Sequence, residues 1–123
     1  MSATKNQFQY CENNVFAKII RKELPAKVVY EDELTIAFHD INPVAPNHII
    51  LIPKGKYCNF LDFTNKATTK EIAHFFLIAN KIANNFNCDF RIVSNNGSGV
   101  GQTVEHFHLH LIAGKKISNL IAD

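Results

Sequence analysis

The stretch His-Phe-His-Leu-His-Leu at residues 106–111 constrains the fold more than any other part of the sequence. Polar and apolar residues alternate strictly along it, and this period of two is typical of a β-strand with one buried face. In such a strand the three histidines project from one side, while Phe107, Leu109 and Leu111 project from the other. The chain must therefore contain a sheet that rests on a hydrophobic core and presents a row of imidazoles on its opposite face.

The composition fits one compact globular domain of 123 residues. Hydrophobic residues make up 46% of the chain and charged residues 20%, so a modest core can be buried. The net charge of +2 is too small for a surface that binds nucleic acid or a membrane, and the sequence has no basic run. The apolar runs, such as residues 49–52, are too short to span a bilayer.

Cysteine usage indicates a reducing compartment. Cys11, Cys58 and Cys88 are far apart, odd in number and form no CxxC pair, which predicts free thiols rather than disulfides or a cysteine zinc site. Residues 1–13 are polar and lack the apolar core of a signal peptide. We therefore expect a cytoplasmic protein with a flexible tail over residues 1–13 and a single domain over residues 14–123.

The remaining periodicities predict an α+β fold, with a mainly antiparallel five-stranded sheet, one long helix and one short helix. The motif Thr68-x-x-Glu71 is a capping box that begins the long helix, and its apolar positions continue to Phe86. Residues 54–67 lack a regular pattern and are expected to be irregular. The other predicted elements are a helix over 15–22, closed by Pro25, and strands over 28–31, 34–40, 48–52, 90–94 and 105–113.

The long helix is apolar on more than one side. Ile72, Phe75 and Ile82 follow helical spacing along one face, and Leu77 and Ile78 widen the apolar surface beyond it. A helix of this kind is expected to be covered twice, once by its own sheet and once by another chain. The sequence therefore predicts a homodimer.

Three interpretations of the histidine face can be compared. A solvated face that carries three alternating histidines by chance has little to favour it. A metal site could use two adjacent histidines about 7 Å apart, but His106 and His110 lie roughly 13 Å apart by the same rise, and no third ligand is evident. The third interpretation is nucleophilic catalysis by one imidazole, which is nucleophilic when it is neutral near pH 7.

A glycine-rich loop over residues 95–103 precedes the histidines and favours the catalytic interpretation. Gly97, Gly99 and Gly101 allow backbone N–H groups to approach an anion closely, and Gln102 and Thr103 add neutral donors. An anion site next to a nucleophilic strand suits a phosphate ester or amide as substrate.

These residues resemble the histidine-triad (HIT) superfamily, whose HxHxHxx signature corresponds to residues 106–112. Three stretches resemble its nucleotide-binding, phosphoramidase-like branch, in the family's order and spacing. They are NVFAKIIRKELPAKVVYED at 14–32, AFHDINPVAPNHIILIPK at 37–54, and NGSGVGQTVEHFHLHLIAG at 96–114. The resemblance covers roughly residues 14–114 and implies one HIT domain that extends its sheet across a homodimer.

The resemblance also implies a role for each matched residue. His108 is implied to be the nucleophile, His110 to contact the phosphate and help protonate the leaving group, and His106 and His48 to support them. The residues implied to bind the nucleotide are Phe16, Ile19, Phe38, His39 and Ile41 around the base, Asp40 at the ribose hydroxyls, and Asn95, Gly101, Gln102, Thr103 and Val104 along the phosphate loop.

The sequence departs from that branch at three places. Thr103 stands where the branch often has serine, and the tail over residues 115–123 lacks the tryptophan and proline of animal members. Zinc-carrying members have paired cysteines near the N-terminus, whereas Cys11 has no partner at the matching place near Ala17. We therefore expect no structural zinc and no other metal or cofactor.

The predicted function is hydrolysis of a purine nucleoside 5′-phosphoramidate. The resemblance implies a nucleotidyl-histidine intermediate on His108 and release of a nucleoside monophosphate such as AMP. Two alternatives stay open at this point: a nucleotide-binding regulatory module with little turnover, and a dinucleoside polyphosphate hydrolase.

Overall fold

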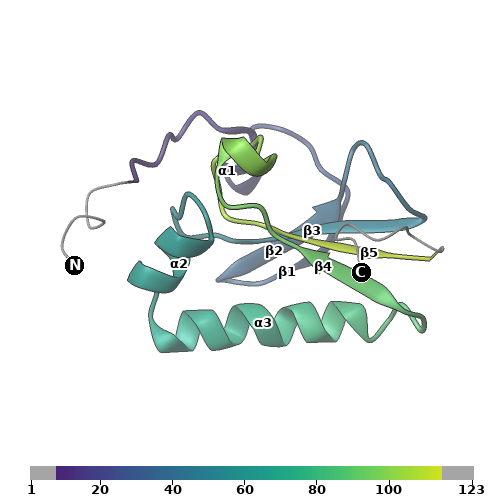
Figure 1. The fold of residues 1–123 in the computed structure, drawn as a ribbon. Coiled ribbons are helices and arrows are strands. Elements are labelled where there is room, and N and C mark those ends of the chain that lie inside the picture. The colour runs from purple at the N-terminus through teal and green to yellow at the C-terminus, as the bar shows by residue number, and fades with distance from the viewer. Residues whose placement is uncertain (1–7, 115–123) are drawn as a thin grey trace.

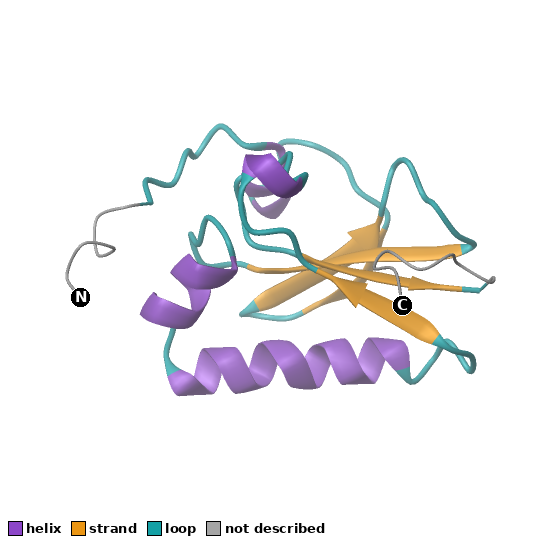
Figure 2. Cartoon of the chain, viewed as in Figure 1, coloured by secondary structure: helices purple, strands orange, loops and turns teal. Residues whose placement is uncertain are grey.

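A five-stranded antiparallel sheet forms the centre of the computed structural model, which describes residues 8–114 (Figure 1). The strand order is β1-β2-β3-β5-β4, and helices lie on both faces of the sheet (Figure 2). The strands are β1 (Val28–Glu31), β2 (Thr35–His39), β3 (Asn47–Pro53), β4 (Phe90–Val93) and β5 (Leu109–Ala113). The helices are α1 (Val15–Ile20), α2 (Phe60–Lys66), α3 (Thr69–Ala83) and the short 3-10 turn η1 (Ser98–Val100). The predicted α+β fold with an antiparallel five-stranded sheet is therefore confirmed.

The central strand β3 is buried on both faces, which explains its continuous apolar run. Side chains alternate between two hydrophobic clusters. Leu51 points toward α3 together with Leu109 and Leu111, while Ile50 points toward α1 together with Phe38. The sheet thus separates a core that lies between the sheet and α3 from a smaller apolar layer between the sheet and α1. The histidine face lies on the α1 side.

The long helix α3 begins at the predicted capping box. The Thr68 side chain accepts a hydrogen bond from the Glu71 backbone N–H, and the Glu71 carboxylate accepts one from the Thr68 backbone N–H. Its buried residues are Phe75, Ile78, Ala79, Ile82 and Ala83. Of the two residues that widen the apolar surface, Ile78 belongs to this core and Leu77, which is 68% exposed, faces away from it.

The sequence analysis was wrong about residues 54–67, because residues 60–66 form helix α2. Asn59 caps this helix by accepting a hydrogen bond from the Asp62 backbone N–H at 2.9 Å. Phe63 is fully buried, and its ring stacks on Phe107 with the centroids 4.8 Å apart. One deeply buried aromatic in seven residues gives no helical periodicity, so a tertiary contact decided this element.

Several element boundaries also differ from the prediction, and two of them have a clear cause. Helix α1 ends at Ile20, before Pro25, because Lys22 adopts a left-handed conformation with φ of 65°. Strand β5 begins at Leu109 rather than at residue 105, since the register places Phe107 opposite Pro53, which has no N–H for the ladder. The Phe107 N–H donates to the Tyr57 carbonyl instead.

Two composition-based expectations can be compared with the structure. Cys11, Cys58 and Cys88 are free thiols, as predicted. Within residues 8–114, no helix has both the length and the hydrophobicity needed to cross a bilayer.

Replacing the cap of α3 tests its contribution to stability. Thr68→Ala removes the side-chain acceptor of the first turn, and we expect the free energy of unfolding to fall by about 1 kcal/mol. Thr69→Ala changes an exposed threonine one residue later and keeps the cap, so we expect a change below about 0.5 kcal/mol. Urea unfolding followed by circular dichroism measures both. Equal effects of the two variants would contradict the assigned cap.

Candidate active site

The three histidines of the 106–111 stretch lie on the α1 side of the sheet, opposite the main core. Phe107, Leu109 and Leu111 point into the core beneath α3, as the alternation predicts. His106 and His108 are buried, and the His110 side chain is 20% exposed. His48 comes from the neighbouring strand β3, and its ring lies 5.1 Å from that of His110. The structure thus brings together all four histidines that the sequence analysis named as catalytic.

The hydrogen bond of His108 defines which of its nitrogens can react. Its Nδ1 lies 2.6 Å from the backbone carbonyl oxygen of His106, which can only accept, so Nδ1 bears the proton. A neutral imidazole with a proton on Nδ1 has its lone pair on Nε2. Burial lowers the pKa of His108 below its usual value, which favours this neutral form. His108 therefore has a free nucleophilic nitrogen at neutral pH.

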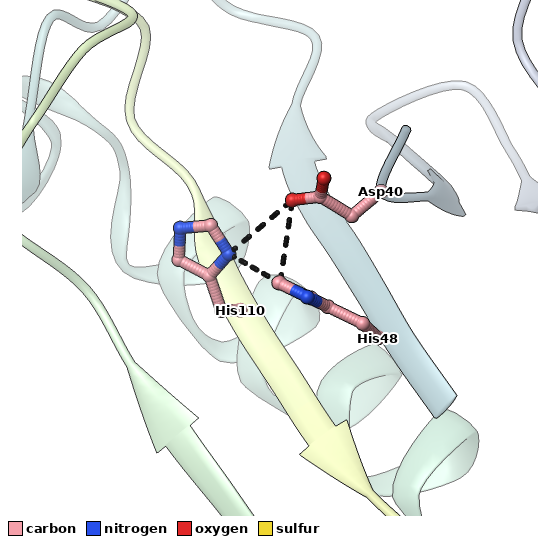
Figure 3. A group of neighbouring side chains, drawn as sticks. All are labelled: Asp40, His48 and His110. Atoms are coloured by element: carbon pink, nitrogen blue, oxygen red, sulfur yellow. Dashed lines mark hydrogen bonds and ion pairs between the residues drawn. The ribbon is translucent and has the colours of Figure 1, made fainter. Parts of the chain in front are cut away.

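A second chain of hydrogen bonds defines the proton on His110. The Val44 backbone N–H donates to His48 Nδ1 at 3.1 Å, so the proton of the neutral His48 ring is on Nε2. That Nε2–H donates to His110 Nδ1 at 2.9 Å, as Figure 3 shows. His110 Nδ1 is an acceptor here, and its own proton is on Nε2. The histidine row, which is His106, His108 and His110, therefore places a lone pair on His108 next to a donor on His110, with the two ring centroids 5.0 Å apart.

His106 is held at both ring nitrogens. Its Nε2–H donates to the Pro53 carbonyl oxygen at 2.7 Å, and its Nδ1 accepts from the Tyr10 hydroxyl at 2.5 Å. The ring is fully buried, and burial lowers its pKa to about 4. His106 is thus a neutral, fixed ring whose backbone carbonyl orients His108.

Burial keeps the other two rings neutral as well. It lowers the pKa of His110 to about 4, with the nearby His108 and His48 adding to this effect and Asp40 opposing it. Burial is also the main cause of the lowered pKa of His48. In the free protein at pH 7 the site is therefore a set of neutral imidazoles beside one carboxylate.

Asp40 lies at the end of β2 and faces His48 and His110 (Figure 3). Its Oδ2 is 3.3 Å from His48 Nε2 and 3.9 Å from His110 Nδ1, while its Oδ1 accepts from the Asn42 backbone N–H. Asp40 thus has two tasks, since one oxygen fixes the turn after β2 and the other points into the site.

Asp40, His48 and His110 lie close enough together to hold a metal ion, because one ligand atom of each residue lies within 4.8 Å of the others. The sequence analysis found no carboxylate ligand next to a histidine pair, and the structure supplies Asp40. The hydrogen bonds of the His48 ring argue against a metal, however. A metal on His48 Nε2 needs the lone pair of that atom, and the Val44 N–H already uses the lone pair on Nδ1. A neutral His48 ring can therefore bind Val44 or a metal, but not both.

The glycine-rich loop is ordered by its own hydrogen bonds. Gly97 and Gly101 have φ values of 110° and 102°, a left-handed region that favours glycine. The sequence analysis expected Gln102 to donate to phosphate. Its side chain is instead used within the protein, since Oε1 accepts from the Gly97 N–H and Nε2 donates to the carbonyl oxygens of Cys58 and Val104. Gln102 therefore supports the loop rather than facing a ligand.

The other residues proposed for the loop and the base pocket fall into two groups. Phe16, Ile19 and Phe38 are buried in the apolar layer beneath α1, and Val104 packs against that layer. His39, Gly101 and Thr103 are exposed, Asn95 is partly exposed, and Ile41 is 91% exposed. Among these residues Phe16 lies against the histidines, because its ring meets that of His108 edge-on with the centroids 5.0 Å apart.

A groove of about 440 Å³ lies where α1 is followed by β1. It contains Ile19 from the expected base pocket and none of the histidines. Its lining is Ile19, Lys22, Glu23, Leu24, Pro25, Ala26 and Val28.

Comparison with known proteins places this site in a family. A model of the HIT domain matches residues 21–117. The chain belongs to the HIT domain family. An uncharacterised HIT-like protein of Rickettsia prowazekii is 50% identical over 115 residues, covering 91% of this chain and 96% of its own. The family resemblance inferred from the histidine motif is therefore confirmed.

Solved structures show the same fold. A HIT family hydrolase from Clostridium thermocellum has a TM-score of 0.80 at 39% identity, covering 91% of this chain and 99% of that one. A hypothetical histidine triad nucleotide-binding protein from Sulfolobus tokodaii has a TM-score of 0.70 at 31% identity, covering 79% and 66% respectively.

Two residues that shape this HIT site were missed in the sequence. Val44 acts through its backbone N–H, for which no side-chain signal exists. Tyr10 lies in the segment expected to be a tail and outside the residues matched by the HIT model. Val44 acts on His48, and Tyr10 acts on His106 of the motif, 96 residues away in the chain.

The neutral HIT histidines predict a specific loss of stability in acid. Unfolded histidine binds a proton near pH 6.5, whereas His106 and His110 bind one in the folded protein only near about pH 4. Unfolding therefore takes up protons between these values, and its free energy should fall, on the order of 1–3 kcal/mol for each ring, as the pH is lowered through this window.

Denaturant unfolding at several pH values measures this decrease. His110→Asn has one buried imidazole fewer and should lose less stability between pH 6.5 and pH 4 than the unmodified protein. The same pH dependence in both proteins would show that His110 does not resist protonation in the fold.

Proposed function

We propose that this chain is a nucleotide hydrolase that cleaves purine nucleoside 5′-phosphoramidates at the α-phosphate. The observation that carries the proposal is the proton arrangement of the histidine row. His108 has an unprotonated Nε2 because Nδ1 donates to the His106 carbonyl, and His110 beside it has its proton on Nε2. A nucleophile next to a proton donor is what displacement of an amine from phosphorus requires.

In the first step, His108 Nε2 attacks the α-phosphorus. A nitrogen–phosphorus bond forms to His108, the bond to the amine breaks, and its electron pair goes to the leaving nitrogen. The bound phosphate is an anion beside His110 and favours uptake of a second proton from solvent on Nδ1 of that ring, against the effect of burial. The His48 Nε2–H then donates to Asp40 Oδ2, 3.3 Å away, instead of to His110. The His110 imidazolium then gives its Nε2 proton to the amine and returns to the neutral form.

In the second step, a water molecule attacks the phosphorus of the nucleotidyl-histidine. His110 Nε2 takes a proton from this water, the bond to His108 breaks, and the electron pair returns to His108 Nε2. The nucleoside monophosphate leaves, and His110 is again ready to donate. The two steps balance, since His110 gives one proton and regains one.

The surroundings support a nucleotide as substrate. Asp40 Oδ2 points into the site and can accept hydrogen bonds from ribose hydroxyls. Such bonds are charge-assisted, because the acceptor is a carboxylate. The exposed Ile41 and the groove beside Ile19 supply apolar surface for a base. Among the structural relatives, one is named a hydrolase and another a nucleotide-binding protein, which is consistent with this proposal.

Substitution of the nucleophile tests the mechanism. With an adenosine phosphoramidate, His108→Ala should lower kcat at least ~10³-fold while AMP still binds, because base and ribose contacts lie on other elements. His110→Ala should reduce turnover most for amine leaving groups, which need a proton, and less for an activated leaving group. Rapid quench with mass spectrometry should find a nucleotidyl adduct on the peptide containing residues 106–110.

The control is His74→Gln, which changes a histidine on α3 outside the site and should retain activity. Near-normal turnover by His108→Ala would exclude the covalent mechanism. AMP binding by the unmodified protein without turnover of any adenylate would favour the alternative of a nucleotide-binding regulatory module. Dinucleoside polyphosphates as the better substrates would favour the second alternative.

We also propose that the chain forms a homodimer. Leu77 is 68% exposed and Phe76 is 40% exposed on α3, on the surface that the main core leaves uncovered. Phe90 and Ile92 are about half exposed on β4, which is an edge strand of the sheet. An exposed apolar helix surface together with an apolar edge strand is the kind of patch that a second copy covers.

A single charge on α3 tests this assembly. Leu77→Asp should convert the dimer to a monomer without unfolding it, because the side chain is exposed and outside the core. Leu61→Asp, at an exposed leucine on α2, is the matched control and should remain dimeric. Light scattering at micromolar concentration measures both. A monomeric unmodified protein would contradict the proposal.

A further inference from the structure

The segment before α1 reaches the histidine row through Tyr10. The Tyr10 hydroxyl donates to His106 Nδ1 at 2.5 Å, and the two rings meet edge-on with centroids 5.4 Å apart. The direction of this bond is fixed, because His106 Nε2–H donates to the Pro53 carbonyl and the neutral ring has only Nδ1 left as an acceptor. Tyr10 is thus the donor to a fully buried imidazole of the active site.

This contact is part of a broader attachment. Glu12 pairs with Lys56 at 2.9 Å, and Asn14 caps α1 by accepting from the Ala17 backbone N–H at 2.8 Å. The sequence analysis expected residues 1–13 to be a flexible tail. Within that segment, Tyr10 and Glu12 make polar side-chain contacts with the domain, and residues 1–7 lie outside the described part of the chain.

The contact continues from Tyr10 to the nucleophile in two steps. Tyr10 and Pro53 hold the His106 ring at both nitrogens, which restricts the rotation of the side chain and the backbone from which it projects. The carbonyl of that same residue accepts from His108 Nδ1 at 2.6 Å. Phe16 packs edge-on against the rings of His106 and His108 and completes the enclosure.

We propose that Tyr10 is a positioning residue for the nucleophile: the Pro53 carbonyl fixes the tautomer of His106, the Tyr10 hydroxyl holds that ring in one orientation, and the His106 carbonyl thereby keeps the reactive lone pair of His108 on Nε2. The inference rests on the proposed function for its catalytic consequence, but the hydrogen bond at His106 Nδ1 can be measured without turnover. It also gives the N-terminal segment a role in the chemistry, since docking of residue 10 completes the site.

The test is Tyr10→Phe, which keeps the ring and removes the donor. We expect kcat for an adenosine phosphoramidate to fall about tenfold, the usual scale for loss of one buried hydrogen bond. The Kd for AMP should change less than twofold, because the Tyr10 hydroxyl bonds His106, which is not assigned to the base or the ribose. Long-range proton–nitrogen NMR should show the Nδ1 signal of His106 moving toward that of a nitrogen without a hydrogen bond.

The matched control is Glu12→Gln, which removes the ion pair of the same segment but keeps the phenol. It should retain both kcat and the His106 Nδ1 signal. A ring-fluorinated tyrosine at position 10, whose phenol ionises at lower pH, gives a second measurement. Because a tyrosinate cannot donate, the alkaline decline of kcat should move to lower pH with this residue.

The outcomes separate this inference from the proposed function. Tyr10→Phe with kcat within twofold of the unmodified protein, or with only AMP binding weakened, would overturn the positioning role. If the unmodified protein turns over no phosphoramidate, the proposed function fails, and the NMR signal decides alone. An unmoved His106 Nδ1 signal in Tyr10→Phe would then overturn the inference, and a moved one would support it.

Discussion

The hydrogen bond from His108 Nδ1 to the His106 carbonyl is the contact on which the proposed chemistry depends. It selects one of two tautomers and so decides that Nε2 is the free nitrogen. The bond is possible because the residues before Leu109 are released from the sheet ladder, where Pro53 offers no N–H. In this released segment, the Pro53 carbonyl and the Ser94 hydroxyl can bind His106 and the backbone of His108 instead.

Burial on the α1 side gives the site its electrostatic character. The imidazoles are covered by the apolar layer that includes Phe16 and Phe38, and loss of solvent penalises their charged forms. A row of closely spaced histidines would repel itself if the rings were protonated. Neutral rings can donate and accept in series, as the contacts from Val44 through His48 to His110 show. The low dielectric constant of this buried site would also strengthen the electrostatic interaction between His110 and a bound phosphate.

Helix α2 and the glycine-rich loop form one supported unit. Gln102 donates to the Cys58 carbonyl, and the Asn96 side chain accepts from the Leu61 backbone N–H. The buried Asp62 accepts from the Cys58 N–H, which fixes the start of this unit. Phe63 then stacks on Phe107 within the histidine stretch. The loop that faces the proposed phosphate is therefore braced against the core side of the same 106–111 stretch that presents the nucleophile.

The sequence by itself determined the sheet, the two-sided character of the 106–111 stretch and the start of α3. These follow from local rules, namely alternation, the unbroken apolar run of β3 and the Thr68–Glu71 capping box. It also singled out His106, His108 and His110, because histidine has no structural reason to alternate in a strand, whereas His48 was named only through the family resemblance. Only the tertiary structure decided α2, the proton on each ring and the docking of Tyr10. Helix α2 depends on Phe63 meeting Phe107, and the protons depend on the Val44 amide and on carbonyls of distant residues. The contacts of Phe63 with Phe107 and of Pro53 with His106 join groups far apart in the chain, and backbone donors such as the Val44 N–H leave no trace in residue type, so local patterns could not supply them.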